Sequence, residues 1–414
     1  MKDDGFDVVI GNPPYVKARD SKDMTTRRFV EESGEYETPY KMWDLYVAFV
    51  ERGIKLLKPD GVFAMIVPDT IGVADYTKKL VGFIINKYSL YQIDFFPNIE
   101  VFTGVGVRST IIFVKNTKNS KKCKRFLHEA KVENIKLLDT VENNTTNIFK
   151  LNSSKIESNF ENTIPLGNIC YVSYGARFNS DKVDPIKFKK ADLLSDIKDS
   201  IHTHRYTEGK YLEKYKIVKE LFVEWGTDRC PKRLVRPTFK ELYPPEKLLM
   251  SRQKRITALS TNGEICDNTI IVGVPYFSIK NVKNASIEKY LKNVRLDRNE
   301  AEKTSLKFDL KYLLAILNSK LIRYLLKTQS RSKIDSYPDD WKLVPIKDIT
   351  KADQKKFIEL TEEILSLNKH LNQIPKNVKV SDEIKRYEEE IDELVYKLYN
   401  LTEEEKRVIE EDLA

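Results

Sequence analysis

The sequence has little of what builds disulfide or metal sites. Its 414 residues include 4 histidines and 4 cysteines, and the cysteines lie far apart with no paired spacing, at Cys123, Cys170, Cys230 and Cys266. Disulfide frameworks and zinc sites need regularly spaced ligands. His202 and His204 are close in sequence, but in a polar stretch they are typical of surface groups. The sequence therefore predicts reduced thiols and no metal.

Long apolar runs are missing as well. No stretch approaches the roughly 20 apolar residues that span a bilayer, which indicates no membrane contact. The N-terminus, Met1-Lys2-Asp3-Asp4, lacks the basic and apolar regions of a signal peptide. With 41% hydrophobic and 32% charged residues, the composition is typical of a soluble globular protein of two or three domains. We expect a cytoplasmic protein.

The charge balance is basic. A net charge of +9 and a pI near 9.0 favour a polyanionic partner. Many basic proteins bind no polyanion, so the charge by itself identifies no partner.

The most informative stretch lies near the N-terminus. Val8 to Ile10 is a short β-branched run that ends at Gly11 and two prolines, which predicts a buried strand followed by a rigid loop. In open α/β sheets the ligand crevice lies beyond the carboxyl ends of the strands. The loop from Asn12 to Tyr15 is therefore the candidate site.

The residue types of this loop suit an amino group. Asn12 offers a side-chain carbonyl, and Pro13 and Pro14 have carbonyls but no N–H, so the loop is rich in acceptors. Two acceptors can hold the hydrogens of an exocyclic amine and leave its lone pair free to attack. Tyr15 offers a flat face for a ring, worth about 1–3 kcal/mol when a base stacks on it.

Asn-Pro-Pro-Tyr directly after an Asp-Val-Val-Ile strand resembles the catalytic motif of the DNA adenine-N6 methyltransferases. A chance loop is the alternative. The resemblance implies S-adenosylmethionine as the methyl donor and base flipping. It also implies roles for Asn12 and the Pro13 carbonyl in orienting the adenine amine, for Pro14 in fixing the loop, and for Tyr15 in holding the base.

The next elements follow the same fold. Apolar residues recur at three and four from Met42 to Leu57, which predicts a helix, and the run from Val62 to Val67 predicts a strand buried on both faces. Together with the first strand they form a β-α-β unit. A helix at 74–88 and strands at 90–96 and 109–115 follow. The polar, basic segment 16–40 is either a flexible segment that orders over DNA or a solvated loop.

An aromatic residue before the last strand is also expected in such a domain. In the methyltransferases that this segment resembles, that residue packs on the flipped base opposite the motif tyrosine, and Phe102 occupies this place. A core phenylalanine at a strand turn is the alternative.

The cofactor-binding half of such a domain is not visible. It should carry a strand, a Gly-rich turn and an acidic residue upstream of the tetrapeptide, where this chain has eleven residues. Gly104 and Gly106 form GxG with no following helix, and no Gly-rich strand-to-helix turn follows downstream. We expect strands four to seven of a Rossmann-like sheet, cofactor-binding residues that stay unassigned, and an upstream fragment or subunit as a partner.

Composition divides the chain into three parts. We expect a partial methyltransferase catalytic domain at 1–150, an α+β target-recognition domain at 160–348 and a helical tail at 349–414. The helix 311–327 and the segment from Ser336 to Ile346 resemble the TaqI-like specificity domain. Basic residues that follow a predicted strand are candidate contacts to double-stranded DNA, or else solvated or structural groups: Arg252, Lys254 and Arg255.

The tail has a regular apolar period. Apolar residues recur at three and four from Phe357 to Ile374 and again from Ile384 to Leu398, which predicts an antiparallel helical hairpin. Thr402 and Glu405 form a capping-box pattern for a last helix.

The fold class we expect is α/β, with a partial Rossmann-like methyltransferase domain, an α+β recognition domain and a helical hairpin. The resemblance implies that the chain is the C-terminal part of a TaqI-like or type IIG adenine-specific DNA methyltransferase of a restriction system. The alternative is a catalytically inactive DNA-recognition or assembly subunit left by gene fragmentation.

Overall fold

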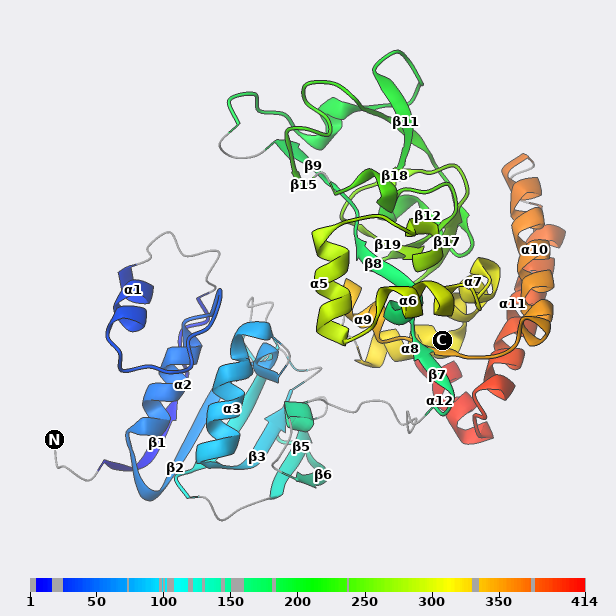
Figure 1. Cartoon of the computed structure of the whole chain (residues 1–414). Coiled ribbons are helices and arrows are strands. Elements are labelled where there is room, and N and C mark those ends of the chain that lie inside the picture. The colour runs from blue at the N-terminus through cyan, green and yellow to red at the C-terminus, as the bar shows by residue number, and fades with distance from the viewer. Residues whose placement is uncertain are drawn as a thin grey trace. The chain divides into compact units, whose positions relative to one another are not determined.

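The computed structural model describes residues 5–16, 25–72, 74–96, 99, 101–102, 108–117, 122–128, 131–142, 146–149, 160–180, 184–236, 238–329, 335–373 and 377–413. The chain forms two compact units, Met1–Leu151 and Asn152–Ala414 (Figure 1). Three sequence features lie outside the described residues: the basic stretch 17–24, the GxG at 104–106 and the Pro-containing break at 374–376.

The first unit is a mixed six-stranded sheet with helices. Its strand order is β1-β2-β4-β3-β5-β6. The strands are β1 (Phe6–Gly11), β2 (Leu57–Pro68), β3 (Ser89–Phe95), β4 (Ser109–Lys115), β5 (Lys122–His128) and β6 (Ile135–Glu142). The helices are α1 (Thr25–Glu32), α2 (Tyr46–Lys55) and α3 (Lys78–Lys87).

Strand direction brings several loops to one edge of this sheet. β1 pairs with β2 in parallel, and β3 pairs with β5 in parallel, while β4 runs antiparallel to both β2 and β3. The strands β1, β2, β3 and β5 therefore share a direction, and their carboxyl ends meet at the same edge. The succession β1-α2-β2 confirms the predicted β-α-β unit.

The helices α2 and α3 cover one face of the sheet. Alternate residues of the central strands, Phe63, Met65 and Val67, are buried in one core with residues of both helices. The helix α2 lies close to the sheet at Gly53, where an added Cβ would stand 2.7 Å from the Phe63 ring. The absence of a side chain at this position lets the helix approach.

The opposite face has no helix on it among the described residues. Val8 and Ile10 of β1 are 55% and 77% exposed. Their register partners on β2, Val62 and Ala64, are half-buried, and so is Phe113 of β4. The sequence predicted burial of these strands on both faces, and the structure differs. Since α2 and α3 lie on the same side and β1 is a sheet edge, the described residues of this unit leave these apolar side chains partly exposed.

The segment after the candidate loop contains a helix that its polar sequence did not predict. The short helix α1 turns Arg27 inward, 4.6 Å from the centre of the buried Trp43 ring. The following residues are tied to α2 by the buried Glu51, which accepts hydrogen bonds from the backbone N–H groups of Glu37 and Thr38, both at 2.9 Å. The described residues 25–40 are therefore held against α2.

The second unit surrounds an antiparallel four-stranded sheet of order β17-β16-β19-β8. Its longer strands are β8 (Cys170–Tyr174), β9 (Arg177–Ser180), β11 (His202–Thr207), β14 (Leu221–Glu224), β16 (Lys247–Ser251), β17 (Thr257–Ser260) and β19 (Ile270–Pro275). Two- and three-residue strands are β7 (Thr163–Pro165), β10 (Leu194–Ser195), β12 (Leu212–Glu213), β13 (Lys216–Ile217), β15 (Leu234–Arg236), β18 (Ile265–Cys266) and β20 (Pro345–Lys347).

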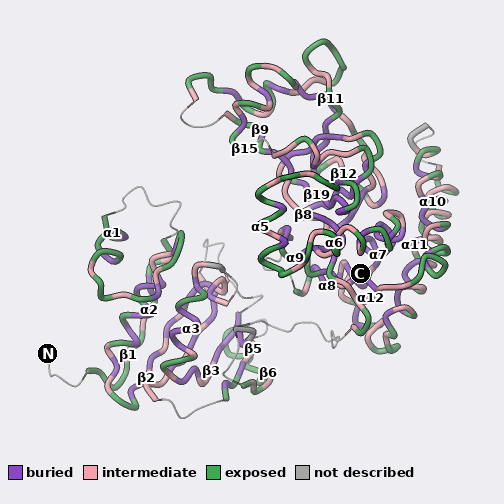
Figure 2. The backbone as a smooth tube through the Cα atoms, in the orientation of Figure 1, coloured by how far each residue is buried: buried purple, intermediate pink, exposed green. Residues whose placement is uncertain are grey.

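Helices cover both faces of this sheet (Figure 2). Leu248, Met250 and Ile271 share a core with α7 and α8, whereas their neighbours Leu249 and Val272 share one with α5 and α6. The helices are α4 (Leu166–Ile169), α5 (Ala285–Val294), α6 (Arg298–Ser305), α7 (Leu310–Asn318), α8 (Lys320–Gln329), α9 (Pro338–Lys342), α10 (Lys351–Gln373), α11 (Val378–Leu398) and α12 (Glu403–Leu413).

The predicted single helix at 311–327 is two helices. The chain breaks at Ser319, which is extended with φ −62° and ψ 153°. Tertiary hydrogen bonds hold this break: the Asn318 side chain binds both the N–H and the C=O of Thr257, each at 2.8 Å, and Asp392 accepts from the Lys320 N–H at 2.7 Å. Because these partners are distant in sequence, periodicity alone could not reveal the break.

The C-terminal helices share the core of α7 and α8. Phe357 and Ile364 of α10 are buried together with Ile391 and Val395 of α11. The helices α10 and α11 lie side by side (Figure 1). The capping box of α12 is confirmed, since the Thr402 N–H donates to Glu405 at 2.8 Å and the Glu405 N–H donates to the Thr402 hydroxyl at 3.3 Å. The boundary at 349 stays a prediction.

The described residues can be checked for disulfides, metal ligands and membrane-spanning helices. All four cysteines are buried and free. His202 lies 2.7 Å from Asp199, and the described part of the chain holds no cluster of three potential metal ligands. Each helix that the structure describes is too short or too polar to cross a bilayer.

The buried Asp392 makes stability depend on pH. Burial raises its pKa from 3.8 to about 6, although the Lys320 N–H and nearby lysines act against this shift. A raised folded-state pKa gives a contribution that is complete below pH 3.8 and is lost as the pH rises through 6. We therefore expect Asp392→Asn, which keeps an acceptor oxygen, to raise the free energy of unfolding at pH 7.5 by about 1–3 kcal/mol.

Urea unfolding at pH 7.5 and at pH 4 measures this effect. The gain should disappear at pH 4, where the native carboxyl is already protonated. Asp382→Asn, at an exposed position on the same helix, is the matched control and should be neutral. Destabilisation by Asp392→Asn at pH 7.5 would contradict the assignment.

Candidate functional site

The candidate loop lies at the carboxyl end of β1. The last register pair of the parallel ladder joins Gly11 to Met65, and the chain then leaves the sheet. Asn12 and Pro14 are exposed, Pro13 is buried and Tyr15 is half-buried. The parallel pairing of β1 and β2 thus presents Asn12 and the ring of Tyr15 at the edge where the carboxyl ends meet.

Asn12 is available to a ligand. Its side chain is exposed, and no described residue hydrogen-bonds it. The amide oxygen is an acceptor, and the two prolines that follow add carbonyl oxygens without adding N–H donors. The role expected from the sequence, an acceptor pair for an amino group, stays a prediction.

The structure brings Tyr15 and Phe102 together. Their ring centres are 6.3 Å apart and the ring planes make an angle of 78°, an edge-to-face contact. Phe102 is half-buried, and eighty-seven positions separate it from Tyr15 in the sequence.

The Tyr15 hydroxyl is buried while its ring is partly accessible. Burial raises the pKa of this phenol, and the nearby Ser109 hydroxyl offsets part of the shift. Neither hydroxyl makes a well-formed hydrogen bond to a described residue. The phenol is therefore neutral at physiological pH, and its ring is the part that can contact a ligand.

A backbone hydrogen bond joins the end of the loop to the segment that precedes α2. The Val16 carbonyl accepts a hydrogen bond from the Leu45 N–H at 3.1 Å, just before α2 begins. Beside it, the Tyr76 hydroxyl donates to Asp44 at 2.6 Å. Burial and this carboxylate raise the pKa of Tyr76 to about 12. The far end of the loop is thereby fixed to the first turn of α2.

Sequence reasoning missed further polar residues at this edge. Asp69 directly follows β2 and pairs with Arg108, which precedes β4, at 3.0 Å. At the ends of β3 and β5, His128 lies 3.2 Å from Asp94 and stacks on Phe96 at 4.2 Å. Asp69 could have been found because it stands immediately after an apolar strand. Only tertiary pairing reveals the contact between Asp94 and His128.

The described residues do not by themselves fit S-adenosylmethionine. In sheets of this class an adenosine-containing cofactor is held by a Gly-rich turn and an acidic residue on strands beyond the catalytic one. In the described sheet β1 is the edge, so no such strand lies beside it. Cofactor-binding residues remain unassigned.

The three predicted DNA contacts all have partners inside the second unit. Arg252 lies between the rings of Tyr174 and Tyr337, at 5.5 and 5.7 Å, and pairs with Asp335 at 3.1 Å. The Lys254 ammonium donates to the backbone carbonyls of residues 210 and 212 at 3.2 and 2.8 Å. Arg255 is half-buried, and burial lowers its pKa. Their contact with DNA stays a prediction.

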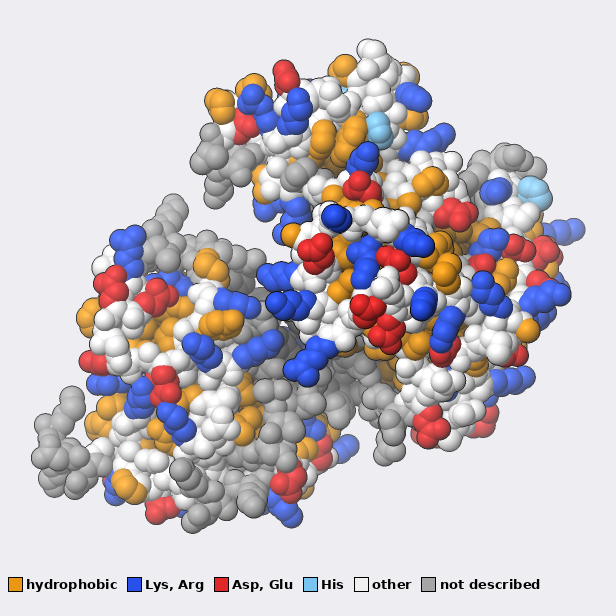
Figure 3. Space-filling view, viewed as in Figure 1, with side chains coloured by type: hydrophobic (Ala, Val, Ile, Leu, Met, Phe, Trp, Pro, Cys, Tyr) orange, Lys and Arg blue, Asp and Glu red, His pale blue; other side chains and the backbone are white. Residues whose placement is uncertain are grey.

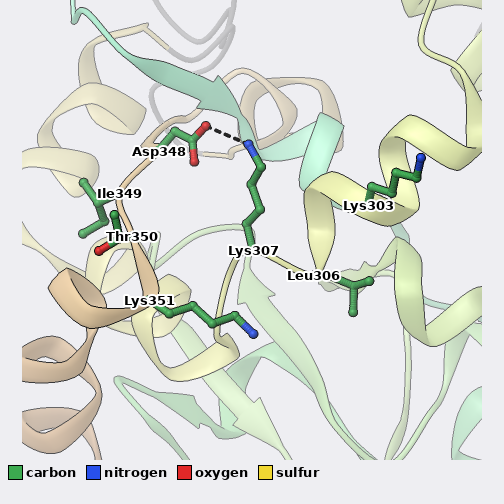
Figure 4. Close-up of a pocket in the computed structure, with 7 residues that line it drawn as sticks. All are labelled: Lys303, Leu306, Lys307, Asp348, Ile349, Thr350 and Lys351. Carbon is green, nitrogen blue, oxygen red and sulfur yellow. Dashed lines mark hydrogen bonds and ion pairs between the residues drawn. The ribbon is translucent and has the colours of Figure 1, made fainter.

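A hollow of about 450 Å³ opens elsewhere on the second unit. It lies where the end of α6 meets the start of α10, and Lys307 crosses it to pair with Asp348 at 3.1 Å (Figure 4). The lining residues are Lys303, Leu306, Lys307, Asp348, Ile349, Thr350 and Lys351. No residue of the candidate loop belongs to it, so it is a separate surface feature.

Comparison with known proteins finds similarity to one family model in the first quarter of the chain. Residues 1–102 match the family model described as Eco57I restriction-modification methylase. The type II restriction enzyme and methyltransferase RM.Eco57I of Escherichia coli is 30% identical over 109 residues, 26% of this chain and 11% of that protein. The type II methyltransferase M.BstVI of Geobacillus stearothermophilus is 32% identical over 117 residues, 28% of this chain and 20% of that protein.

A solved structure is similar over a longer range. The type IIL restriction-modification enzyme MmeI, solved in complex with DNA, matches 95% of this chain and 54% of its own chain, with a TM-score of 0.57 and 11% identity. At this identity the likeness concerns the fold. The N-terminal part of the chain is thus similar to restriction-modification methyltransferases, and the sequence matches span a fifth or less of those relatives' length.

The contacts of Arg252 give a testable structural role. We expect Arg252→Ala to lower the free energy of unfolding of the second unit by about 1–3 kcal/mol, because it removes the contacts with two tyrosine rings and the ion pair with Asp335. Urea unfolding of the full chain is the measurement. Lys232→Ala, at an exposed position, should be neutral. Equal stability of the two variants would show that Arg252 has no structural role.

Proposed function

We propose that this chain is the C-terminal part of a site-specific DNA adenine methyltransferase of a restriction-modification system. It would transfer a methyl group from S-adenosylmethionine to the exocyclic amine of a flipped adenine, together with an upstream fragment or subunit. The observation that carries the proposal is the loop at the end of β1, where the exposed Asn12 stands three residues before Tyr15, which contacts Phe102.

In this proposal the loop holds the amino group without a general base. The Asn12 side-chain oxygen and the Pro13 carbonyl accept the two N–H bonds of the adenine amine. Hydrogen bonds to both hydrogens would leave the nitrogen lone pair free to attack an electrophile, and the acceptors would stabilise the positive charge that develops on the nitrogen. Pro14 limits the backbone freedom of the loop.

Tyr15 and Phe102 hold the base. Extrusion of a base from a duplex costs a few kcal/mol, and stacking on an aromatic ring returns about 1–3 kcal/mol. Tyr15 has a neutral phenol with a buried hydroxyl, so it offers ring surface rather than charge. Asp69 and Arg108, at the same edge of the sheet, stand where the polar edge of a nucleotide would approach.

The comparisons support this proposal at the level of the family. The segment that matches the methylase family model, residues 1–102, includes both the loop and Phe102. The relatives that it matches are described as methyltransferases, and MmeI was solved with DNA. We propose adenine as the target base from the residues of the loop, and S-adenosylmethionine as the methyl donor from the resemblance to the family.

The need for an upstream partner rests on the surface of the first unit. β1 is an edge strand, and its residues Phe6, Val8 and Ile10 are 49%, 55% and 77% exposed. An exposed apolar edge favours pairing with another strand. A cofactor-binding half that adds strands beside β1, and helices on the open face, would cover these residues and complete the site.

The role of the loop is tested in an enzyme reconstituted with an upstream methyltransferase fragment. We expect Asn12→Ala to bind DNA normally and to lose methyl transfer, because one acceptor for the amine is gone. Tyr15→Phe should be mild and Tyr15→Ala should weaken retention of the flipped base by about 1–3 kcal/mol. Transfer is measured with radiolabelled S-adenosylmethionine and base retention with 2-aminopurine fluorescence.

Two outcomes would contradict these assignments. Full transfer by Asn12→Ala would remove Asn12 from the mechanism. A reconstituted enzyme that binds DNA but never transfers methyl groups would favour the alternative, an inactive recognition or assembly subunit.

The exposed edge gives a second prediction. We expect this chain alone to bind no S-adenosylmethionine and to self-associate through β1, and Ile10→Lys to reduce that association because it places a charge on the edge strand. Sedimentation velocity measures association. Ile197→Lys is the control, since Ile197 is 73% exposed and lies in the second unit.

Calorimetry with S-adenosylmethionine tests the first half of this prediction. Micromolar binding to the chain alone would show that it contains a cofactor site, and the proposal of a missing half would be wrong. An equal effect of the two lysine variants on association would remove β1 as the contact.

A further inference from the structure

Five cations of the second unit gather on and around α5. We call this group the α5 basic face, and its members are Lys280, Lys283, Lys289, Lys292 and Arg295. All five are exposed, and none forms an ion pair with any residue in the described part of the chain. One carboxylate, Glu288, stands among them. Lys and Arg side chains gather over α5 on the visible face of the molecule (Figure 3).

This face differs from the other basic regions of the unit. The predicted DNA contacts Arg252 and Lys254 already have partners in the fold. Lysines of the C-terminal helices are paired as well: Lys356 lies 2.8 Å from Glu390, and Lys406 lies 2.7 Å from Glu403. A cation with a partner gains less from a phosphate, because the existing pair must be broken first. The α5 basic face meets no such cost.

The helix presents its charges from a rigid base. Ile287 and Leu291, four residues apart, are buried against the central sheet, and Asn284 caps the helix by accepting from the Ser286 N–H at 2.9 Å. Lys289 lies between these two residues in the sequence and Lys292 follows them, and both side chains are exposed. The inward residues fix the orientation of the helix, and so they fix the direction in which the lysines extend.

A polar cavity adjoins the same helix. It has a volume of about 330 Å³ and is lined by Ser286 and Tyr290 of α5, Tyr171 and Tyr174 of β8, and Tyr337, which precedes α9. Asp339 and Lys342 of α9 also line it and pair with each other at 3.0 Å. Serine and tyrosine hydroxyls are frequent donors to phosphate and sugar oxygens in complexes with DNA. Hydroxyls and aromatic rings beside a row of cations that have no ion-pair partner among the described residues suit the phosphates, sugars and bases of a nucleic acid.

We propose that the α5 basic face binds the phosphate backbone of double-stranded DNA. The inference rests on the proposed function and assigns the partner surface that the function requires. A helix of ten residues is about 15 Å long. One strand of a duplex carries a phosphate about every 3.4 Å along the axis, so the face spans about four phosphates. Its contacts provide affinity and position without reading sequence.

The test uses the full chain and a duplex of random sequence. Four lysines are replaced together, Lys280→Gln, Lys283→Gln, Lys289→Gln and Lys292→Gln, and Arg295 is left in place because its backbone is left-handed with φ 55°. Dissociation constants are measured by fluorescence anisotropy across a salt series. Each lost phosphate contact should lower the slope of log Kd against log salt by about 0.9, so we expect a decrease of about 3 to 4.

A matched variant controls for net charge. Lys355→Gln, Lys356→Gln, Lys406→Gln and Arg407→Gln remove four charges that have ion-pair partners on the C-terminal helices. This variant should keep a slope within about one unit of the unmodified chain. Equal slopes for the two quadruple variants would overturn the assignment to α5.

The outcomes separate this inference from the proposed function. If the unmodified chain binds DNA but the α5 variant keeps its slope, the surface lies elsewhere and the proposed function stands. If the unmodified chain fails to bind duplex DNA at about 50 mM salt, where phosphate contacts are strongest, the DNA-binding part of the proposed function fails first.

Discussion

The parallel pairing of β1 with β2 is the constraint on which the first unit depends. Residues Val8 to Gly11 align with Val62 to Met65, and this register fixes where the chain leaves the sheet. Because the loop follows at once, Asn12 is presented beyond the carboxyl ends of the strands, and Tyr15 reaches the position where it meets Phe102. The hydrogen bond between Val16 and Leu45 closes the far end of the loop. A short strand and a short loop thus acquire a defined geometry from one ladder of backbone hydrogen bonds.

The two faces of this sheet differ in burial. Since α2 and α3 both cross on one side, one face is buried while Ile10 and Phe113 on the other face retain solvent exposure. An exposed apolar edge strand favours pairing with another strand. In the same unit a buried charged group, Glu51, is fully supplied with hydrogen bonds. Burial raises its pKa, but hydrogen bonds from Lys55, Thr38 and two backbone N–H groups outweigh burial and leave the pKa below its usual value. Its stabilising contribution is therefore present above its unfolded-state pKa and is lost as the pH falls through the folded-state pKa.

Electrostatics in the second unit divides the cations into two groups. Arg252 pairs with a carboxylate of the same unit and contacts two tyrosine rings, and the Lys254 ammonium donates to a backbone carbonyl. The cations of the α5 basic face form no ion pair with a residue that the structure describes, although their helix is anchored by the buried Ile287 and Leu291. Counting basic residues in the sequence cannot distinguish these groups. The distinction depends on whether a carboxylate or carbonyl happens to lie within reach after folding.

The sequence by itself determined the features that depend on neighbouring residues: the strand that ends at Gly11, the unit β1-α2-β2, the strand Ser109–Lys115 and the capping box at Thr402. These follow from β-branched runs, prolines and periodicity over a few turns. Only the tertiary structure decided the break at Ser319, the inward Arg27 of α1, the burial of β2 on a single face and the internal partners of Arg252. Each of these is set by a partner remote in sequence, such as Thr257 for Asn318 or Asp335 for Arg252. Local patterns carry no record of such partners, because the contact energy exists only once the chain has brought the two residues together.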